Sequence, residues 1–372
     1  MRKKKIMTIN LFCVLFLIFG TTFIVTKTSA FLIDRPGFYS GKVTFSGKVT
    51  LKKAFSSDPT RLVAGARLDF REDGCIKKTV WTDANGEYSF SYTVSQPERF
   101  YSMSVYKLGY TWQDRLLRPT SSTYEVNYEL DGKVALFMYD SAISDSSTWT
   151  NYGHQLSDDE GFTNIMVRSD PPDWEQCIDQ LDSLETYDSL VFILIHCHGV
   201  FLGDEDSVAL IYEGDDYSSS HTIYSSDFVT KIKCLESINI IVLVDTCHSG
   251  DFVYEYRNEG NSDRILIMSG TEEENYPVDQ GDEGPELYLA ARYYGEGEYN
   301  MWEDPTPIDP NTATEGAFTH YYFDYLAQTS SFTTAFSYAK TATHNYSMDH
   351  FYTDDFYLVQ YPQCYNNLKY TW

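Results

Sequence analysis

Two long apolar segments of the chain each run into a residue that can take part in covalent chemistry. Residues 190–195 are followed closely by His198, and residues 238–244 are followed closely by Cys247. An imidazole can withdraw the proton from a thiol, and the resulting thiolate is a strong nucleophile. A histidine and a cysteine in these positions therefore predict hydrolysis through a cysteine nucleophile.

The segments that carry these two residues have the composition of buried strands. Both are continuous and rich in Val, Ile and Leu, which is typical of strands covered on both faces of a parallel sheet. Ligands bind at the carboxyl ends of such strands, so the histidine and the cysteine would meet at one edge. From residue 133 onward strand and helix patterns alternate, which predicts an α/β fold with a mostly parallel sheet. Strands are expected at residues 133–139, 190–195, 238–244 and 264–269, and helices near 174–184, 226–235, 286–294 and 318–328.

The region before residue 132 has a different pattern. Residues 38–131 contain short alternating segments separated by turn residues, for example at 83–86, and this predicts an all-β sandwich domain. Residues 63–66, 82–88 and 107–110 resemble the carboxypeptidase regulatory-like (transthyretin-like) family. That resemblance implies an accessory, non-catalytic module. We therefore expect two domains, at residues 38–131 and 133–372.

The first 30 residues have the features of a targeting segment. Positively charged residues 2–5 precede a mostly apolar stretch at 9–25, and small residues at 28–30 offer a cleavage position. The apolar stretch approaches the length that spans a membrane, so a cleaved signal peptide and a signal anchor both remain open. Either one predicts a secreted or extracytoplasmic protein, which meets a membrane only if the segment is retained.

The composition argues against one large class of partner. The formal net charge is −26, whereas nucleic-acid binding needs clusters of basic side chains. Seven cysteines are scattered over 372 residues, which is not the pattern of a dense disulfide framework. We therefore expect no nucleic-acid partner.

The strand-end motifs, taken in order, resemble the caspase-like cysteine endopeptidases, a superfamily that contains caspases, metacaspases, legumains and gingipains. The matching residues are His198-Gly199, the Asp-Thr-Cys-His-Ser-Gly sequence at 245–250, and the Gly-Ala-Phe-Thr sequence at 316–319. The resemblance covers about residues 133–350, and a histidine 49 residues before the cysteine is also typical of caspases. It implies a caspase-like α/β/α sandwich and a thiol protease that acts on polypeptides without a cofactor.

The resemblance also assigns catalytic roles to individual residues. Cys247 would be the nucleophile and His198 the general acid and base, with no third catalytic acid. The backbone N–H groups of Gly199 and Cys247 would hold the developing oxyanion, as acyl transfer requires. Glycine suits that position because no Cβ keeps the substrate away from the backbone.

Substrate specificity is expected to depend on Asp245, which comes two residues before the nucleophile. By the resemblance, Asp245 lines the pocket for the residue before the scissile bond, and Ser269 and Gly270 line the same cleft. A carboxylate there favours Arg or Lys. Legumain-like members have Glu at this place and accept Asn, so a basic residue and Asn both remain open.

Other interpretations of the same residues also remain open. His196 shares a strand face with His198, and we choose His198 because a glycine follows it. His196, His198, Cys247 and His248 have the residue types of a zinc site, which would make the protein a zinc hydrolase. A caspase-like protein without activity would be a binding or scaffold protein. The carboxylates within residues 272–283 are a candidate Ca²⁺ site, although their spacing is not that of an EF-hand.

Overall fold

The structure is a computed structural model, and its contacts divide the chain into two compact units. Among the described residues, one unit contains 37–49, Ala64–Val105 and Asp114–Tyr128, and the other contains Thr50–Val63, Tyr106–Gln113 and those from Glu129 onward. The predicted targeting segment and the helix expected near residues 286–294 lie outside the described residues. The predicted domain ranges, 38–131 and 133–372, stay predictions. The described residues are 37–96, 99–141, 144, 146–201, 207–210, 222–246, 249–258, 264–270, 316–353, 356–357, 362–368 and 370.

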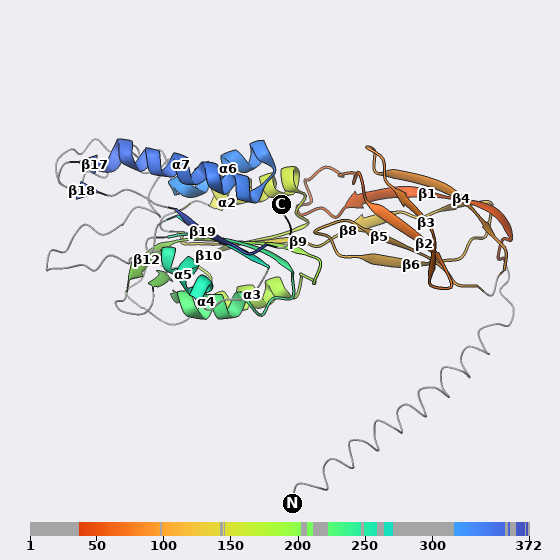
Figure 1. Ribbon diagram of the computed structural model, residues 1–372, viewed down its shortest axis with the longest axis horizontal. Coiled ribbons are helices and arrows are strands. Elements are labelled where there is room, and N and C mark those ends of the chain that lie inside the picture. The colour runs from red at the N-terminus through yellow and green to blue at the C-terminus, as the bar shows by residue number, and fades with distance from the viewer. Residues whose placement is uncertain are drawn as a thin grey trace, which may run out of the picture. The chain divides into compact units, whose positions relative to one another are not determined.

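Two four-stranded sheets contain the strands of the first unit (Figure 1). One has the order β4-β1-β7, with β8 also paired to β1, and the other has the order β3-β2-β5-β6. Exposed and buried residues alternate along β4, so its buried side chains share one face. The assignment to the carboxypeptidase regulatory-like family stays a prediction. The strands are β1 Gly41–Leu51, β2 Arg67–Glu72, β3 Cys75–Trp81, β4 Glu87–Val94, β5 Tyr101–Tyr106, β6 Gln113–Leu117, β7 Thr123–Glu125 and β8 Tyr128–Leu130.

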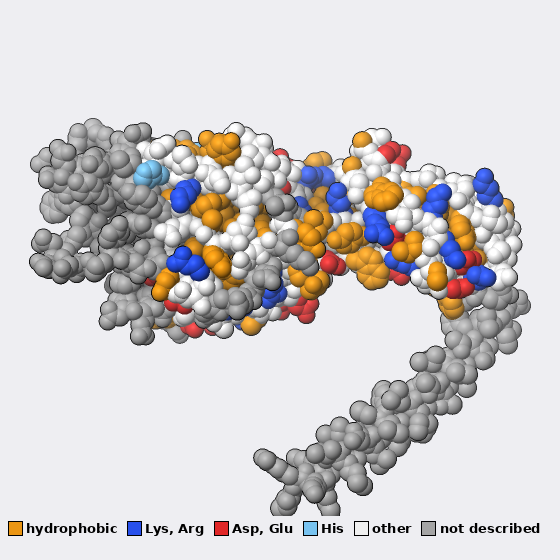
Figure 2. All heavy atoms as spheres, in the orientation of Figure 1, with side chains coloured by type: hydrophobic (Ala, Val, Ile, Leu, Met, Phe, Trp, Pro, Cys, Tyr) orange, Lys and Arg blue, Asp and Glu red, His pale blue; other side chains and the backbone are white. Residues whose placement is uncertain are grey.

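The surface of this unit mixes apolar and charged groups. Large apolar side chains on it are exposed at Ile76, Trp81, Phe100 and Leu116. On the face drawn in Figure 2, hydrophobic side chains lie among Lys, Arg, Asp and Glu over the strands of this unit. Single exposed apolar side chains are normal on protein surfaces, and they identify no partner by themselves.

The second unit is organised by a six-stranded mixed sheet of order β10-β9-β11-β15-β16-β19. Its strands run parallel except β19, which is antiparallel to β16. Every residue of β9, β11 and β15 is buried, which explains why these segments are continuously apolar. The strands are β9 Lys133–Tyr139, β10 Asn164–Ser169, β11 Leu190–His196, β15 Asn239–Asp245, β16 Ile265–Ser269 and β19 Gln363–Asn366.

Helices cover both faces of this sheet (Figure 1), so the predicted α/β class is confirmed. Successive side chains of β11 point to opposite faces of the sheet. Val191 and Ile193 pack with helices α3, α4 and α5 on one face. Phe192 packs with α2, η1, α6 and α7 on the other face. Such alternation follows from the two-residue repeat of a strand. The helices are α2 Ser146–Gln155, η1 Leu156–Glu160, α3 Trp174–Asp182, α4 Ser225–Ile232, α5 Gly250–Asn258, α6 Ala317–Thr329 and α7 Phe332–Phe351.

Two segments that precede residue 129 are tied into the second unit by specific contacts. The Asp58 carboxylate accepts a hydrogen bond from the Ser157 hydroxyl at 2.9 Å. The Tyr110 hydroxyl donates to the backbone carbonyl of Gly161 at 3.0 Å. The compact units therefore interleave along the sequence.

Smaller sheets lie at the periphery of the second unit. Strands β12 His198–Phe201, β13 Ser207–Leu210 and β14 Thr222–Tyr224 form an antiparallel three-stranded sheet. Strands β17 Tyr352–Thr353 and β18 Phe356–Tyr357 form a hairpin-like pair. Within the described part of the chain, no helix has the length and apolar character needed to span a membrane.

Candidate active site

The candidate site is positioned by two neighbouring parallel strands, β11 and β15. They pair in register along their whole length, and the last pair is His196 with Asp245. Both strands therefore end at the same level, on the edge where parallel sheets bind ligands. His198 and Cys247 each come two residues after this last pair. The segments that carry the predicted catalytic residues thus start from adjacent points of one sheet edge.

The predicted dyad itself is only partly described. The backbone of His198 begins β12 directly after β11, and the side chain of His198 lies outside the described part. Cys247 and His248 lie wholly outside it. The dyad, the oxyanion role of the Cys247 N–H group and the zinc alternative therefore stay predictions.

Gly199, Ser269 and Gly270 come at or just after the carboxyl ends of strands β11 and β16. Gly199 is in β12, where it pairs with Ala209. Ser269 ends β16 beside Val244, and the Gly270 N–H donates to the Val244 carbonyl at 3.0 Å. The backbone around Ser269 and Gly270 is thus fixed next to the end of β15, while the substrate role of both residues stays a prediction.

Asp245 is enclosed at the end of β15, where its carboxylate binds the first turn of helix α6. Its side chain is 0% exposed. Its Oδ2 atom accepts two hydrogen bonds from Thr319, one from the backbone N–H at 3.1 Å and one from the hydroxyl at 2.5 Å. The N-cap residue Gly316 provides no side-chain cap, so a carboxylate from a strand occupies the place of a helix cap. The positive end of the helix dipole favours a negative charge there.

Burial dominates the electrostatics of Asp245. It raises the pKa of the carboxyl to about 7, and the two hydrogen bonds from Thr319 oppose that rise. The Oδ1 atom is also buried and has no hydrogen-bond partner. His196, the register partner, has its Nδ1 atom 3.9 Å from Oδ2, which exceeds hydrogen-bond distance. The carboxylate is therefore held on one oxygen only.

Two neighbours of the predicted dyad are buried in the core. The ring of His196 lies with its centroid 5.1 Å from that of Trp149 in α2. Cys197 packs in the core on the face that α3, α4 and α5 cover. Neither side chain is exposed, which favours His198 over His196 as the histidine that meets a substrate. Thr319 is the residue whose role the sequence left unassigned, although it belongs to the matched Gly-Ala-Phe-Thr segment.

Two grooves elsewhere in the chain are acidic. In the second unit, a groove of about 450 Å³ lies at the amino-terminal turns of α3 and α4. Its carboxylates belong to Asp173, Glu175, Asp179 and Asp227, and Lys231 pairs with Asp179 at 2.6 Å. Because α3 and α4 begin after strands β10 and β14, this negative groove follows the carboxyl ends of those strands.

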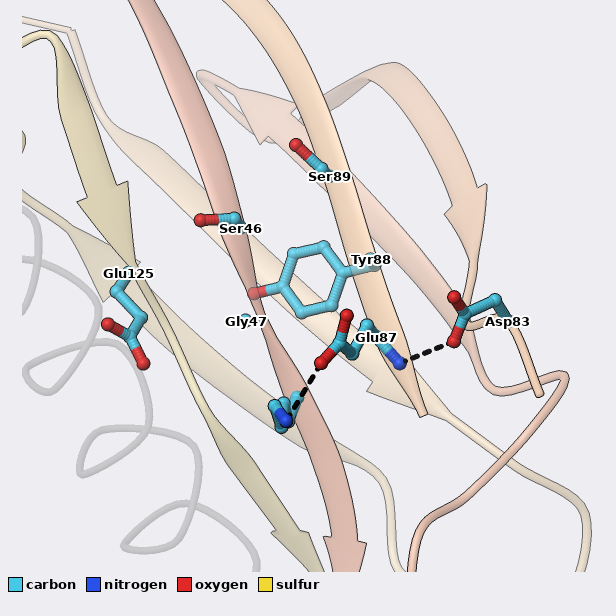
Figure 3. Close-up of a pocket in the computed structure, with 8 residues that line it drawn as sticks. Ser46, Gly47, Asp83, Glu87, Tyr88, Ser89 and Glu125 are labelled. Carbon is cyan, nitrogen blue, oxygen red and sulfur yellow. Dashed lines mark hydrogen bonds and ion pairs between the residues drawn. The ribbon is translucent and has the colours of Figure 1, made fainter. Parts of the chain in front are cut away.

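The groove in the first unit has a different composition (Figure 3). It encloses about 380 Å³ and is lined by Asp83, Glu87 and Glu125 together with polar residues of β1 and β4. Glu87 pairs with Lys48 at 2.8 Å, and Asp83 is occupied by the backbone N–H groups of its own turn. Its lining contains neither histidine nor cysteine, so it is not a candidate site for thiol chemistry.

Candidate metal ligands occur both inside and outside the described residues. Within the described ranges, no three His, Cys, Asp or Glu side chains are grouped so that they could hold a metal ion. The carboxylates proposed as a Ca²⁺ site, within residues 272–283, lie outside those ranges. The calcium site therefore stays a prediction.

Comparisons with known proteins give no match by sequence and weak matches by structure. No protein-family model matches the sequence, and no curated protein matches it. The solved structures that resemble it include drICE, a caspase, at 13% identity and a TM-score of 0.37, covering 65% of this chain and 89% of that one. A carbohydrate acetylesterase from Xanthomonas citri matches at 11% identity and a TM-score of 0.18, covering 62% and 69%. Both TM-scores are below 0.5, so neither likeness indicates what this protein does.

Proposed function

We propose that this protein is a cysteine endopeptidase with a caspase-like α/β/α sandwich. Cys247 is the nucleophile and His198 is the general acid and base. The observation that supports this most strongly is the register of β11 and β15, which brings the segments holding both residues to one sheet edge. The order of the strand-end motifs and the later Gly-Ala-Phe-Thr segment support it from the sequence.

The proposed chemistry is acyl transfer in two steps. The His198 imidazole takes the thiol proton, and the Cys247 thiolate attacks the peptide carbonyl carbon. The N–H groups of Gly199 and Cys247 stabilise the oxyanion, and the imidazolium returns its proton to the leaving amine. Water then attacks the thioester while His198 accepts its proton, which releases the carboxylic acid and the free thiol.

The proposed specificity is for a basic residue before the scissile bond, with Asn as the competing preference. Asp245 supplies a carboxylate two residues before the nucleophile. The acidic groove at α3 and α4 and the net charge of −26 would both attract cationic polypeptides. Ser269 and Gly270 are proposed to line the same cleft.

The remaining parts of the chain are proposed to act outside the chemistry. Residues 1–30 would direct export, so that the protein works outside the cytoplasm, either secreted or held by a retained anchor. The β-rich first unit would be an accessory module of the carboxypeptidase regulatory-like type. Its alternating strands and its turn at residues 83–86 support that proposal.

Hydrolysis of a mixed peptide library tests the proposed function. The unmodified protein should cleave peptides, and Cys247→Ala and His198→Ala should each abolish the cleavage. A library that stays intact with the unmodified protein, or one that is cleaved equally by Cys247→Ala, would overturn the proposal.

A further inference from the structure

We infer that Thr319 is a positioning residue for substrate recognition: it holds Asp245 so that the Oδ1 atom is left to accept a hydrogen bond from a cationic side chain of the polypeptide substrate. The inference rests on the proposed function and adds to it a residue from a distant part of the chain. Thr319 and Asp245 are 74 positions apart in the sequence.

The two oxygen atoms of the Asp245 carboxylate have different surroundings. Both donors of Thr319 converge on Oδ2, at 3.1 Å from the backbone nitrogen and 2.5 Å from the hydroxyl. Oδ1 is buried and has no hydrogen-bond partner. A carboxylate bound on one oxygen by two donors cannot rotate freely, so the orientation of Oδ1 is fixed by Thr319.

Thr319 is itself held in place by the packing of its helix. It lies in the first turn of α6, between Phe318 and Tyr322, which pack in the core on one face of the sheet. Phe318 and Tyr322 are each 0% exposed, so α6 is firmly seated against the strands. The position of the hydroxyl is therefore set by helix packing, and Asp245 is oriented by an element other than its own strand.

The surroundings of Oδ1 determine which kind of group it can bind. A buried acceptor without a partner favours a group that donates a hydrogen bond, and a buried carboxylate favours a positive charge. A guanidinium or ammonium group supplies both, whereas an uncharged side chain supplies at most the hydrogen bond. The titratable side chain of His196 also lies near Asp245. Its Nδ1 atom is 3.9 Å from Oδ2, the oxygen that accepts both hydrogen bonds from Thr319. The substrate class is thus a peptide with a basic residue next to the cleaved bond.

The test compares fluorogenic peptides with Arg or with citrulline, its uncharged isostere, before the scissile bond. Thr319→Val keeps the shape of the side chain and removes the hydroxyl, so it should lower the Arg-to-citrulline ratio of kcat/KM about tenfold. Thr319→Ser restores the donor and should restore the ratio. Thr343→Val is the matched control, because Thr343 is a buried threonine in α7 whose hydroxyl has no hydrogen-bond partner. It should leave the ratio unchanged.

The outcomes separate this inference from the proposed function. An unchanged ratio in an active Thr319→Val variant, or an equal loss on both peptides, would mean that Thr319 is merely structural and would overturn the inference. If Thr319→Val does not fold, Asp245→Asn must lower the Arg-to-citrulline ratio of kcat/KM in the same assay. An unchanged ratio for Asp245→Asn overturns the inference. If the unmodified protein cleaves no peptide, the proposed function is wrong. In that case NMR titration of the Asp245 carboxyl must still show a higher pKa in Thr319→Val, and an unchanged pKa overturns the positioning role.

Discussion

His196 and Asp245 are register partners at the ends of strands β11 and β15, and the Nδ1 atom of His196 lies 3.9 Å from Oδ2 of Asp245. Both side chains are fully buried. The pair therefore marks the level at which both strands end, and the next residue of each segment, Cys197 and Thr246, is still buried. His198 and Cys247 come one residue later.

The first prediction concerns the pH dependence of stability. The folded-state pKa of Asp245 is raised to about 7, above the value of about 3.9 expected in the unfolded chain. The folded protein thus binds the extra proton between these values, so Asp245 makes the free energy of unfolding fall as pH rises from about 4 to about 7. Asp245→Asn removes this dependence. Its stability relative to the unmodified protein should rise across that window by roughly 1 kcal/mol per pH unit.

Denaturant unfolding at pH 4, 5, 6, 7 and 8 measures this difference. Asp324→Asn, an exposed position on the same helix α6, is the matched control and should show a small effect that does not follow the window. A difference between Asp245→Asn and the unmodified protein that stays constant from pH 4 to pH 8 would show that the Asp245 carboxyl is not buried as described.

The second prediction concerns Lys133, whose ammonium group is buried in the second unit. Burial lowers its pKa to about 8, although its Nζ donates to the Glu160 carbonyl and lies 5.4 Å from the Tyr110 ring centroid. Below about pH 8 the buried charge destabilises the fold, and that penalty disappears as pH rises from about 8 toward the unfolded value of about 10.4. Lys133→Met should therefore raise the free energy of unfolding most below pH 8.

Unfolding curves at pH 7, 8, 9 and 10 check the sign of this effect. The gain from Lys133→Met should stay nearly constant from pH 7 to pH 8 and shrink from pH 8 to pH 10, whereas Lys340→Met, at an exposed position in α7, should show no such trend. A gain that grows with pH would contradict the lowered pKa.

The third prediction concerns the choice between Arg and Asn before the cleaved bond. An ion pair with Asp245 in a desolvated pocket should favour Arg by on the order of 2–4 kcal/mol, because an unpaired buried charge is destabilising. Steady-state cleavage of matched Arg and Asn fluorogenic peptides gives the two values of kcat/KM. Asp245→Asn should remove most of the preference. Faster cleavage of the Asn peptide by the unmodified enzyme would show that the pocket is not selective for basic residues.

The sequence predicts best the strands that are buried on both faces. β9, β11, β15 and β16 follow from their continuous apolar composition to within a residue or two at each end. Strand β10 was missed because it is an edge strand, and most of its residues are only partly buried. Helix α7 was missed because Ser and Thr are scattered through it without a clear apolar repeat. In such segments tertiary packing outweighs local propensity.

For the candidate site, the sequence predicts which segments come together but not the contacts between residues far apart in the chain. The order of the motifs along the chain predicts that His198 and Cys247 follow neighbouring strands, and the register of β11 and β15 confirms that the strands are neighbours. The contact between Asp245 and Thr319 was not predicted, because it joins a strand end to a helix 74 residues away. The raised pKa of Asp245 also depends on burial by several elements, which no local pattern reports.

Whether Cys247 is the nucleophile of a peptide hydrolase is decided by the rate at which the Cys247→Ala variant cleaves peptides. The rate should fall by at least about a thousandfold, because loss of a nucleophile leaves only binding and oxyanion stabilisation. Cys234→Ala, which removes an exposed thiol elsewhere, should retain full activity. Iodoacetamide should inactivate the unmodified enzyme and EDTA should not, since a zinc hydrolase would respond in the opposite way. Undiminished cleavage by Cys247→Ala would contradict the account.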